Sequence, residues 1–277
     1  MPTDITTPIR PEIRLIDGLA IRIAQGERNP ALGAEALLLS PWPESLYAFE
    51  PTWARLAEHA NLTAVDLPGF GHSERREALM SPSAMGEFIV KIADALGLEY
   101  PHVVGPDVGT SASLFAAARH PGRFRSLVVG TGGAAVPLEL GEPLKGWVQD
   151  DVEGYRSIDG REVVKIALGT LERYTPSDAA REDYLSAYAG ERFYQSLSYV
   201  RKYPQELPVL RDLLSKIGTP VNVVSGANDT VVPRGNAEFL AERLPNANLA
   251  LTDAGHFIWE DGADAYATEV VSWWERH

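Results

Sequence analysis

Short apolar runs alternate with longer amphipathic stretches along most of the chain. The runs at residues 13–16 and 20–24 flank Asp17-Gly18, a dipeptide typical of tight hairpin turns, and predict an antiparallel hairpin. Later runs have the near-continuous hydrophobic character of strands that are buried on both faces of a parallel sheet. These predicted strands cover residues 36–40, 62–66, 102–107, 124–130, 221–226 and 247–252.

Amphipathic stretches with the period of a helix separate these predicted strands. One stretch follows Ser81-Pro82-Ser83, which is typical of a helix start, and ends at Gly97, a residue that commonly terminates helices. The alternation of strand and helix predicts an α/β fold with a mostly parallel, doubly wound sheet. The predicted helices of this set cover residues 49–60, 81–97, 110–120, 235–244 and 263–274.

One long interval breaks this alternation. Residues 137–211 contain no strand pattern but do contain three helical patterns, at 161–173, 177–189 and 192–203. So long a stretch does not fit a single connection in a compact domain. We therefore expect a helical cap at 137–211, inserted into a core formed by residues 1–136 and 212–277.

Composition and charge narrow the possible functions. The 277 residues include 25 basic and 38 acidic side chains, and the net charge of −13 argues against binding to nucleic acid or an anionic membrane. The absence of cysteine excludes disulfides and thiol nucleophiles. The beginning of the chain does not resemble a signal peptide, and no apolar run is long enough to span a bilayer. We expect a cytoplasmic protein with a small-molecule substrate, and the sequence leaves open whether it forms a homodimer.

The candidate chemistry begins at the end of the strand predicted at 102–107. Gly105-Pro106-Asp107-Val108-Gly109 has the pattern small–x–acid–x–small between a strand and a helix, as in a nucleophile elbow with Asp in the usual Ser place. An acid at this point could equally serve as a helix N-cap. The pattern alone leaves both interpretations of Asp107 open.

Two further residues favour the catalytic interpretation. Asp229 follows the strand predicted at 221–226, and His256 follows the strand predicted at 247–252. Nucleophile, acid and histidine would then lie at the carboxyl ends of strands, where active sites of open α/β sheets gather, and in the chain order of the α/β-hydrolase fold. We predict that Asp107, Asp229 and His256 form a catalytic triad.

With these motifs, the sequence resembles the α/β-hydrolases that use an aspartate nucleophile, the epoxide hydrolases and haloalkane dehalogenases, over nearly its whole length. Ser40 and Pro41 stand where that family has His and Gly. The family motifs present are Ser40-Pro41-Trp42-Pro43-Glu44-Ser45, Asp66-Leu67-Pro68-Gly69-Phe70-Gly71-His72-Ser73, the elbow at Asp107, and Asp253-Ala254-Gly255-His256-Phe257.

The resemblance implies a two-step hydrolysis. Asp107 attacks an electrophilic carbon and forms an alkyl ester, and His256, oriented by Asp229, then activates a water that attacks the ester. The backbone N–H groups of Trp42 and Val108 would form the oxyanion hole. The histidines are scattered and no glycine-rich phosphate loop follows the first strand, so we expect neither a metal nor a cofactor.

The resemblance puts epoxide hydrolysis first among the reactions, because family members take the acid for ring opening from cap tyrosines. Tyr194 is the first candidate for this acid, and Tyr155 and Tyr199 are candidates for a second. Haloalkane dehalogenation is the alternative, in which Trp147 could donate to the halide, although Val108 offers no side-chain donor beside the nucleophile. Two other readings are an ester or lactone hydrolase that uses Asp107 as a base, and a ligand-binding protein without catalytic activity.

Overall fold

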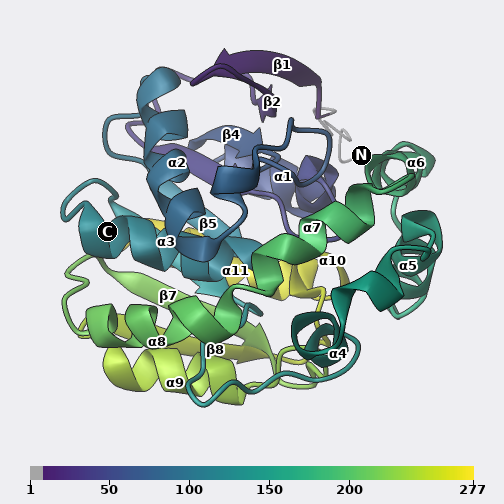
Figure 1. Ribbon diagram of the computed structural model, residues 1–277. Helices are drawn as coiled ribbons and strands as arrows, with labels where there is room; N and C mark the ends of the chain where they lie inside the picture. The colour runs from purple at the N-terminus through teal and green to yellow at the C-terminus, as the bar shows by residue number, and fades with distance from the viewer. Residues whose placement is uncertain (1–8) are drawn as a thin grey trace.

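Eight strands form one sheet at the centre of the computed structural model, which describes residues 9–277 (Figure 1). The order across the sheet is β1-β2-β4-β3-β5-β6-β7-β8. The strands are β1 (Pro11–Ile16), β2 (Leu19–Gln25), β3 (Glu35–Leu39), β4 (Asn61–Val65), β5 (His102–Pro106), β6 (Ser126–Gly130), β7 (Val221–Gly226) and β8 (Ala247–Thr252). Each strand predicted from the sequence is confirmed, with boundaries within about two residues.

The strand directions confirm a mostly parallel sheet with an antiparallel start. β1 pairs antiparallel with β2, and β2 pairs antiparallel with β4, whereas all other neighbours are parallel. The hairpin between β1 and β2 turns at Asp17 and Gly18, whose φ angles of 51° and 75° are both left-handed. A turn with two such residues matches the twist of the flanking strands, and Asp-Gly adopts it readily.

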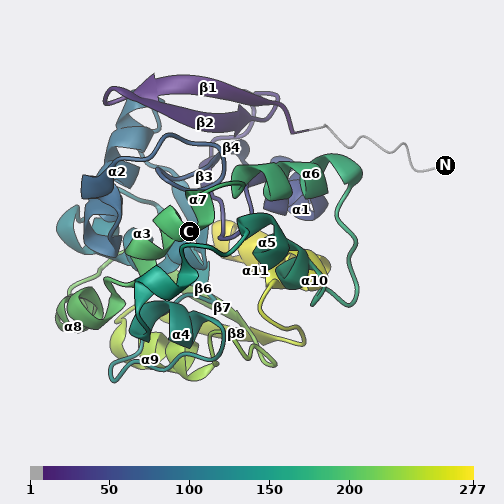
Figure 2. The same ribbon diagram turned by 45° about the vertical axis from the view of Figure 1, so that its right-hand side comes forward.

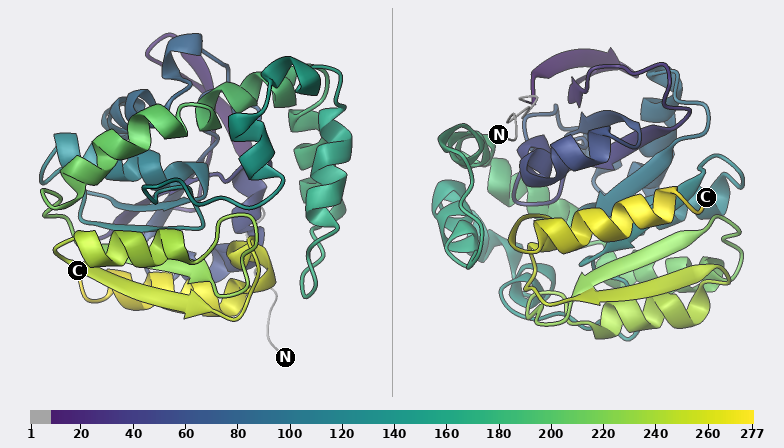
Figure 3. Two further views of the ribbon diagram at one scale, coloured as in Figure 1. Left: turned by 60° about the horizontal axis from the view of Figure 1, so that its bottom comes forward. Right: turned by 180° about the vertical axis from the view of Figure 1, so that it is seen from behind.

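Helices cover both faces of the sheet. α2 (Pro82–Ala95), α3 (Val108–Arg119), α8 (Tyr203–Leu214) and α9 (Gly235–Arg243) pack in one core. On the other face lie α1 (Glu50–Ala57) and α11 (Ala263–Trp274), seen in the right-hand view of Figure 3, together with the short α10 (Ile258–Asp261). In β3, Leu37 and Leu39 point to the first core and Ala36 and Leu38 to the second. Apolar residues at every position of a strand are therefore needed to fill both cores.

The segment between β6 and β7 contains the group of helices expected there. It includes α4 (Leu144–Gln149), α5 (Gly160–Leu168), α6 (Asp178–Ala187) and α7 (Arg192–Val200), which gather on one side of the sheet (Figure 2). Three short 3₁₀ helices complete the structure: η1 (Leu46–Phe49), η2 (Glu77–Leu79) and η3 (Val152–Tyr155). The cap boundary predicted at residue 211 falls inside α8, which packs on α2, α3 and α9.

Polar contacts join α7 and the turn before it to a loop of the core. The Arg192 guanidinium donates to the carbonyl oxygens of Phe70 and Gly71, at 3.2 and 2.9 Å, and also to that of Ser73. The Tyr188 hydroxyl donates to the Glu44 carbonyl oxygen at 3.0 Å. These bonds fasten the inserted helices over the loops that follow β3 and β4.

None of the helices within residues 9–277 has the length and apolarity needed to cross a membrane.

Candidate active site

Asp107 lies at a sharp turn between β5 and α3. Its φ and ψ angles are 50° and −120°, an uncommon conformation for a residue with a side chain, which typically costs about 1–3 kcal/mol. The turn also demands small neighbours. A Cβ on Gly105 would lie 2.4 Å from Ser113 Oγ, and one on Gly132 would lie 2.2 Å from the Asp107 carbonyl oxygen. Asp107 is therefore held in a strained, forward-projecting conformation beside two glycines that a residue with a side chain cannot replace without a shift of their neighbours.

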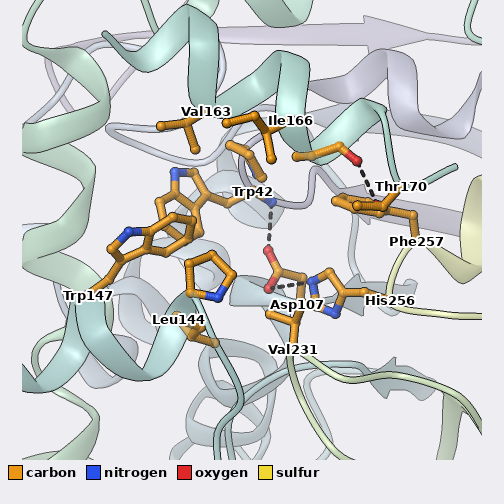
Figure 4. Close-up of a pocket in the computed structure, with 13 residues that line it drawn as sticks. Trp42, Asp107, Leu144, Trp147, Val163, Ile166, Thr170, Val231, His256 and Phe257 are labelled. Carbon is orange, nitrogen blue, oxygen red and sulfur yellow. Dashed lines mark hydrogen bonds and ion pairs between the residues drawn. The ribbon is translucent and has the colours of Figure 1, made fainter. Parts of the chain in front are cut away.

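The two carboxylate oxygens of Asp107 have different environments (Figure 4). Oδ2 accepts a hydrogen bond from the backbone N–H of Trp42 at 2.6 Å. Oδ1 lies 3.9 Å from His256 Nε2. One oxygen is thus held by a backbone donor, while the other faces the histidine.

His256 is oriented by Asp229. Its Nδ1 lies 2.9 Å from Asp229 Oδ2, and the other oxygen of Asp229 accepts from the N–H groups of Val231 and Val232, each at 2.8 Å. This pairing places the proton of the neutral ring on Nδ1 and leaves the Nε2 lone pair directed towards Asp107. Such an arrangement suits a nucleophile, a base and an orienting acid.

The surroundings of Asp107 and His256 shift the pKa values of both side chains. Burial raises the pKa of Asp107 to about 6, against the opposing effects of His256 and of the N–H groups of Trp42 and Val108. Burial alone would lower the pKa of His256, but Asp229, through its charge and hydrogen bond, and Asp107 raise it above its ordinary value. Asp107 is therefore ionised above neutral pH, while the carboxylates of Asp229 and Asp107 favour the protonated form of His256.

A cavity of about 230 Å³ opens in front of Asp107. Trp42, with its indole packed edge-on against Trp147 at 5.0 Å between ring centroids, forms one wall. Apart from Asp107, Thr170 and His256, the described residues that line this cavity have aliphatic or aromatic side chains or are prolines. The full lining is Trp42, Pro43, Asp107, Pro143, Leu144, Trp147, Val163, Ile166, Ala167, Thr170, Val231, His256 and Phe257.

A second, more polar cavity of about 450 Å³ borders the first one. The two share Thr170, Val231, His256 and Phe257. Asn228, Thr230 and Arg173 line the polar cavity further out. His256 therefore borders both the apolar and the polar cavity.

The structure brings together most, but not all, of the residues expected at the site. Trp147 lines the cavity, and Trp42 contributes both a wall and a backbone donor. The three tyrosines do not line it. The Tyr194 hydroxyl donates to Glu153 at 2.7 Å, that of Tyr155 to Asp150 at 2.8 Å, and that of Tyr199 to the Val108 carbonyl oxygen at 2.7 Å.

Several lining residues were not foreseen from the sequence. Val163, Ile166 and Thr170 reach the cavity from α5 and the turn after it, and Leu144 reaches it from α4. The amphipathic pattern of 161–173 indicated a helix, but it did not indicate which side of the helix faces the nucleophile. Phe257 follows His256 directly, and this position beside the histidine is a signal in the sequence that it lies at the cavity.

The described part of the chain contains no group of three or more His, Asp or Glu side chains that could hold a metal ion.

Comparisons with known proteins agree with this fold. The chain is 29% identical to the RutD protein of Caulobacter sp. (strain K31), named for carbamate hydrolysis, over 93% of this chain and 96% of that protein. It is 27% identical to a 2-hydroxymuconate semialdehyde hydrolase of Pseudomonas putida, over 89% and 87% of the two chains. The structure of the enol-lactonase from Burkholderia xenovorans LB400 superposes with a TM-score of 0.77 at 20% identity, covering 96% of this chain and 100% of that one. Residues 37–263 match the model of the family described as "alpha/beta hydrolase fold", and the chain therefore belongs to the α/β-hydrolase family.

Proposed function

We propose that this protein is a hydrolase that attacks a small, largely apolar electrophile with Asp107 and passes through an Asp107 ester. The observation that supports the proposal is that the two carboxylate oxygens of Asp107 have different partners. Oδ2 accepts from the Trp42 N–H, and Oδ1 faces His256 at 3.9 Å. Oδ1 is then the attacking atom, and Oδ2 already occupies the site where an oxyanion develops in the second step.

The first step forms a bond between Oδ1 and the substrate carbon while the leaving group departs with its electron pair. In the second step, His256 Nε2 takes a proton from water and the water oxygen bonds to Cγ of Asp107. The negative charge that develops on Oδ2 faces the N–H groups of Trp42 and Val108. Collapse releases the alcohol, which receives the proton from His256, and leaves Asp107 as the free acid. The second proton of the attacking water then leaves Asp107 for solvent, which regenerates the carboxylate.

The cavity lining bears on the leaving group. Epoxide opening needs an acid for the alkoxide, and Tyr194, Tyr155 and Tyr199 all direct their hydroxyls to other partners. A leaving group that departs as a stable anion, such as a halide, needs no such proton. We therefore place halide-type substrates ahead of the epoxides that the sequence had put first.

A second candidate is hydrolysis of an ester, lactone or related carbonyl compound with Asp107 as a general base. The raised pKa of Asp107, about 6, suits proton transfer near neutral pH. The names of the relatives, which refer to carbamate, lactone and semialdehyde hydrolysis, also support this class.

Intact mass spectrometry on the His256→Gln variant tests the proposal. Without its base the enzyme should stall at the ester, and a haloalkane should add the mass of its alkyl group while the double variant with Asp107→Asn gains none. An adduct with the mass of a whole epoxide would restore the epoxide reaction.

A single turnover of the wild-type enzyme in ¹⁸O-labelled water separates the two candidates. Under the ester mechanism, unlabelled oxygen from Asp107 enters the product and the label enters Asp107. Label that enters the product directly would show that Asp107 acts as a base and would overturn the ester proposal.

A further inference from the structure

Two buried glutamates lie beside the active site and take no part in the proposed mechanism. Glu44 is 1% exposed and follows Trp42, the oxyanion donor, by two residues. Glu260 is 2% exposed, lies in α10 and follows His256 by four residues. Each acid therefore belongs to a short segment that also carries a residue of the site.

The hydrogen bonds of these carboxyl groups leave one oxygen on each for the other. Trp259 Nε1 donates to Glu44 Oε2 at 2.8 Å, and the Tyr184 hydroxyl donates to Glu260 Oε1 at 3.1 Å. Glu44 Oε1 and Glu260 Oε2 are both buried and have no hydrogen-bond partner among residues 9–277. Trp259 links the two side chains, because its indole binds Glu44 and the next residue in α10 is Glu260. A hydrogen bond between the two free oxygens would require a proton, because two carboxylates can only accept.

We propose that Glu44 and Glu260 share one proton, and that this shared proton is a positioning device which holds the oxyanion segment against the histidine segment. Its functional part rests on the proposed ester mechanism. Only a few residues separate the glutamate pair from the Trp42 N–H group and from His256. Glu44 is in the same segment as the Trp42 N–H that binds Asp107, and Trp259, its indole donor, packs edge-on to His256 at 6.0 Å between ring centroids. Through Tyr184 the pair also contacts α6 of the cap.

Burial and mutual proximity favour retention of the proton. Burial raises the pKa of Glu44, and the negative charge of Glu260 raises it further. Burial also raises the pKa of Glu260. The other titratable groups that face the pair, from the elements packed around it, are Asp107, Glu50, Asp261, Tyr174 and Tyr184. Since the acids among them add negative charge, a second ionisation of the pair would leave two adjacent buried anions with no cation to offset them among these groups.

The triad alone predicts activity that only rises with pH. Asp107 must be ionised to attack and His256 must be neutral to accept a proton, so each contributes an acidic limb. The nearby Tyr174 and Tyr184 have pKa values raised above their ordinary value by burial, and they do not titrate below it. An alkaline fall in activity must therefore come from another group, and loss of the shared proton supplies one.

The test measures single-turnover rates of ester formation and ester hydrolysis from pH 6 to pH 10. The wild-type rate of ester hydrolysis should fall about tenfold per pH unit beyond an alkaline midpoint, as expected for loss of one proton. Glu260→Gln keeps a hydrogen-bond donor to Glu44 without a titrating proton, and its rate should stay within about twofold of its plateau. Glu238→Gln, on the remote α9, should retain the wild-type fall. A wild-type profile without an alkaline limb, or the same limb in Glu260→Gln, would overturn the positioning role.

A second measurement does not depend on any substrate. Infrared difference spectroscopy of the wild-type protein at pH 8 should contain the absorption of a protonated carboxyl group, and both Glu44→Gln and Glu260→Gln should lack it. If the band is absent from the wild type, the pair shares no proton and the proposal fails. If the band is present and no substrate forms an ester, the proton sharing stands and the proposed function fails.

Discussion

At the scale of single residues, Asp107, the proposed nucleophile, carries a cost in stability. Its backbone is strained, and its carboxylate is buried beside an apolar cavity. Because burial raises its pKa to about 6, the folded protein binds this proton more tightly than the unfolded chain does. The associated stability is complete below about pH 4 and is lost as the pH rises through 6.

Replacing Asp107 with Asn should therefore stabilise the protein while abolishing turnover. A pKa shift of about two units corresponds to about 3 kcal/mol, so the free energy of unfolding at pH 8 should rise by up to this amount. Urea unfolding at pH 8 and at pH 4 measures the difference, which should shrink towards zero at pH 4. Asp253→Asn, at an exposed position, serves as the control and should change little at either pH. A destabilised Asp107→Asn variant at pH 8 would contradict the argument.

At the scale of elements, the strands could be predicted because apolar runs of five or six residues identify buried strands directly. α8 was not predicted, apart from Tyr203 at the end of the helix predicted at 192–203, because Pro208 lies inside it and interrupts the helical pattern. The triad residues could be placed at strand ends from chain order. The residues that the cap contributes to the cavity could not be predicted. One side of α5 forms the cavity wall, and the choice of side depends on tertiary packing.

The dependence on tertiary packing also explains why the directions of the tyrosine side chains could not be predicted. The sequence put Tyr194 and Tyr199 in one helical segment, and the structure places both in α7. Tyr199 is fully buried and bonds to the carbonyl of Val108, whereas Tyr194 bonds to Glu153 at the surface. Helical period relates the two positions to each other, but it does not determine the direction in which the helix lies on the core.

The attachment of α7 gives a prediction at this scale. Arg192 reaches three carbonyl oxygens with one planar guanidinium, which a lysine ammonium cannot match in geometry. Arg192→Lys should lower the free energy of unfolding by about 1–3 kcal/mol. Arg211→Lys, at an exposed site where the arginine pairs with Asp212, should change it by less than about 0.5 kcal/mol. Equal effects in denaturant titrations would show that the carbonyl contacts contribute nothing.

At the scale of the whole molecule, one hydrophobic cluster extends from the sheet into the inserted helices. It includes Ile21 of β2 and Phe88 of α2 together with Tyr184, Phe193 and Leu197 of α6 and α7. Such a shared core couples the stability of the two parts, because neither can expose its face without exposing the other.

We therefore expect the cap and the core to unfold together. Far-ultraviolet circular dichroism reports all helices, while the fluorescence of Trp147 reports α4, and it can be isolated by comparison with Trp147→Phe. The two denaturant transitions should have the same midpoint. An earlier transition confined to Trp147 would indicate that the segment at 137–211 is a separate folding unit.

The apolar cavity also has a consequence for selectivity among substrates of increasing length. Each methylene group buried in it should add about 0.8 kcal/mol of binding free energy, or about a fourfold gain in kcat/KM, in an unbranched homologous series. The gain must stop when the chain fills the volume of about 230 Å³, and longer members should lose it as they crowd Leu144 and Trp147. When kcat/KM is measured with a series of 1-bromoalkanes, the chain length at the maximum would report the length of the cavity. Leu144→Ala should move that maximum to a longer chain.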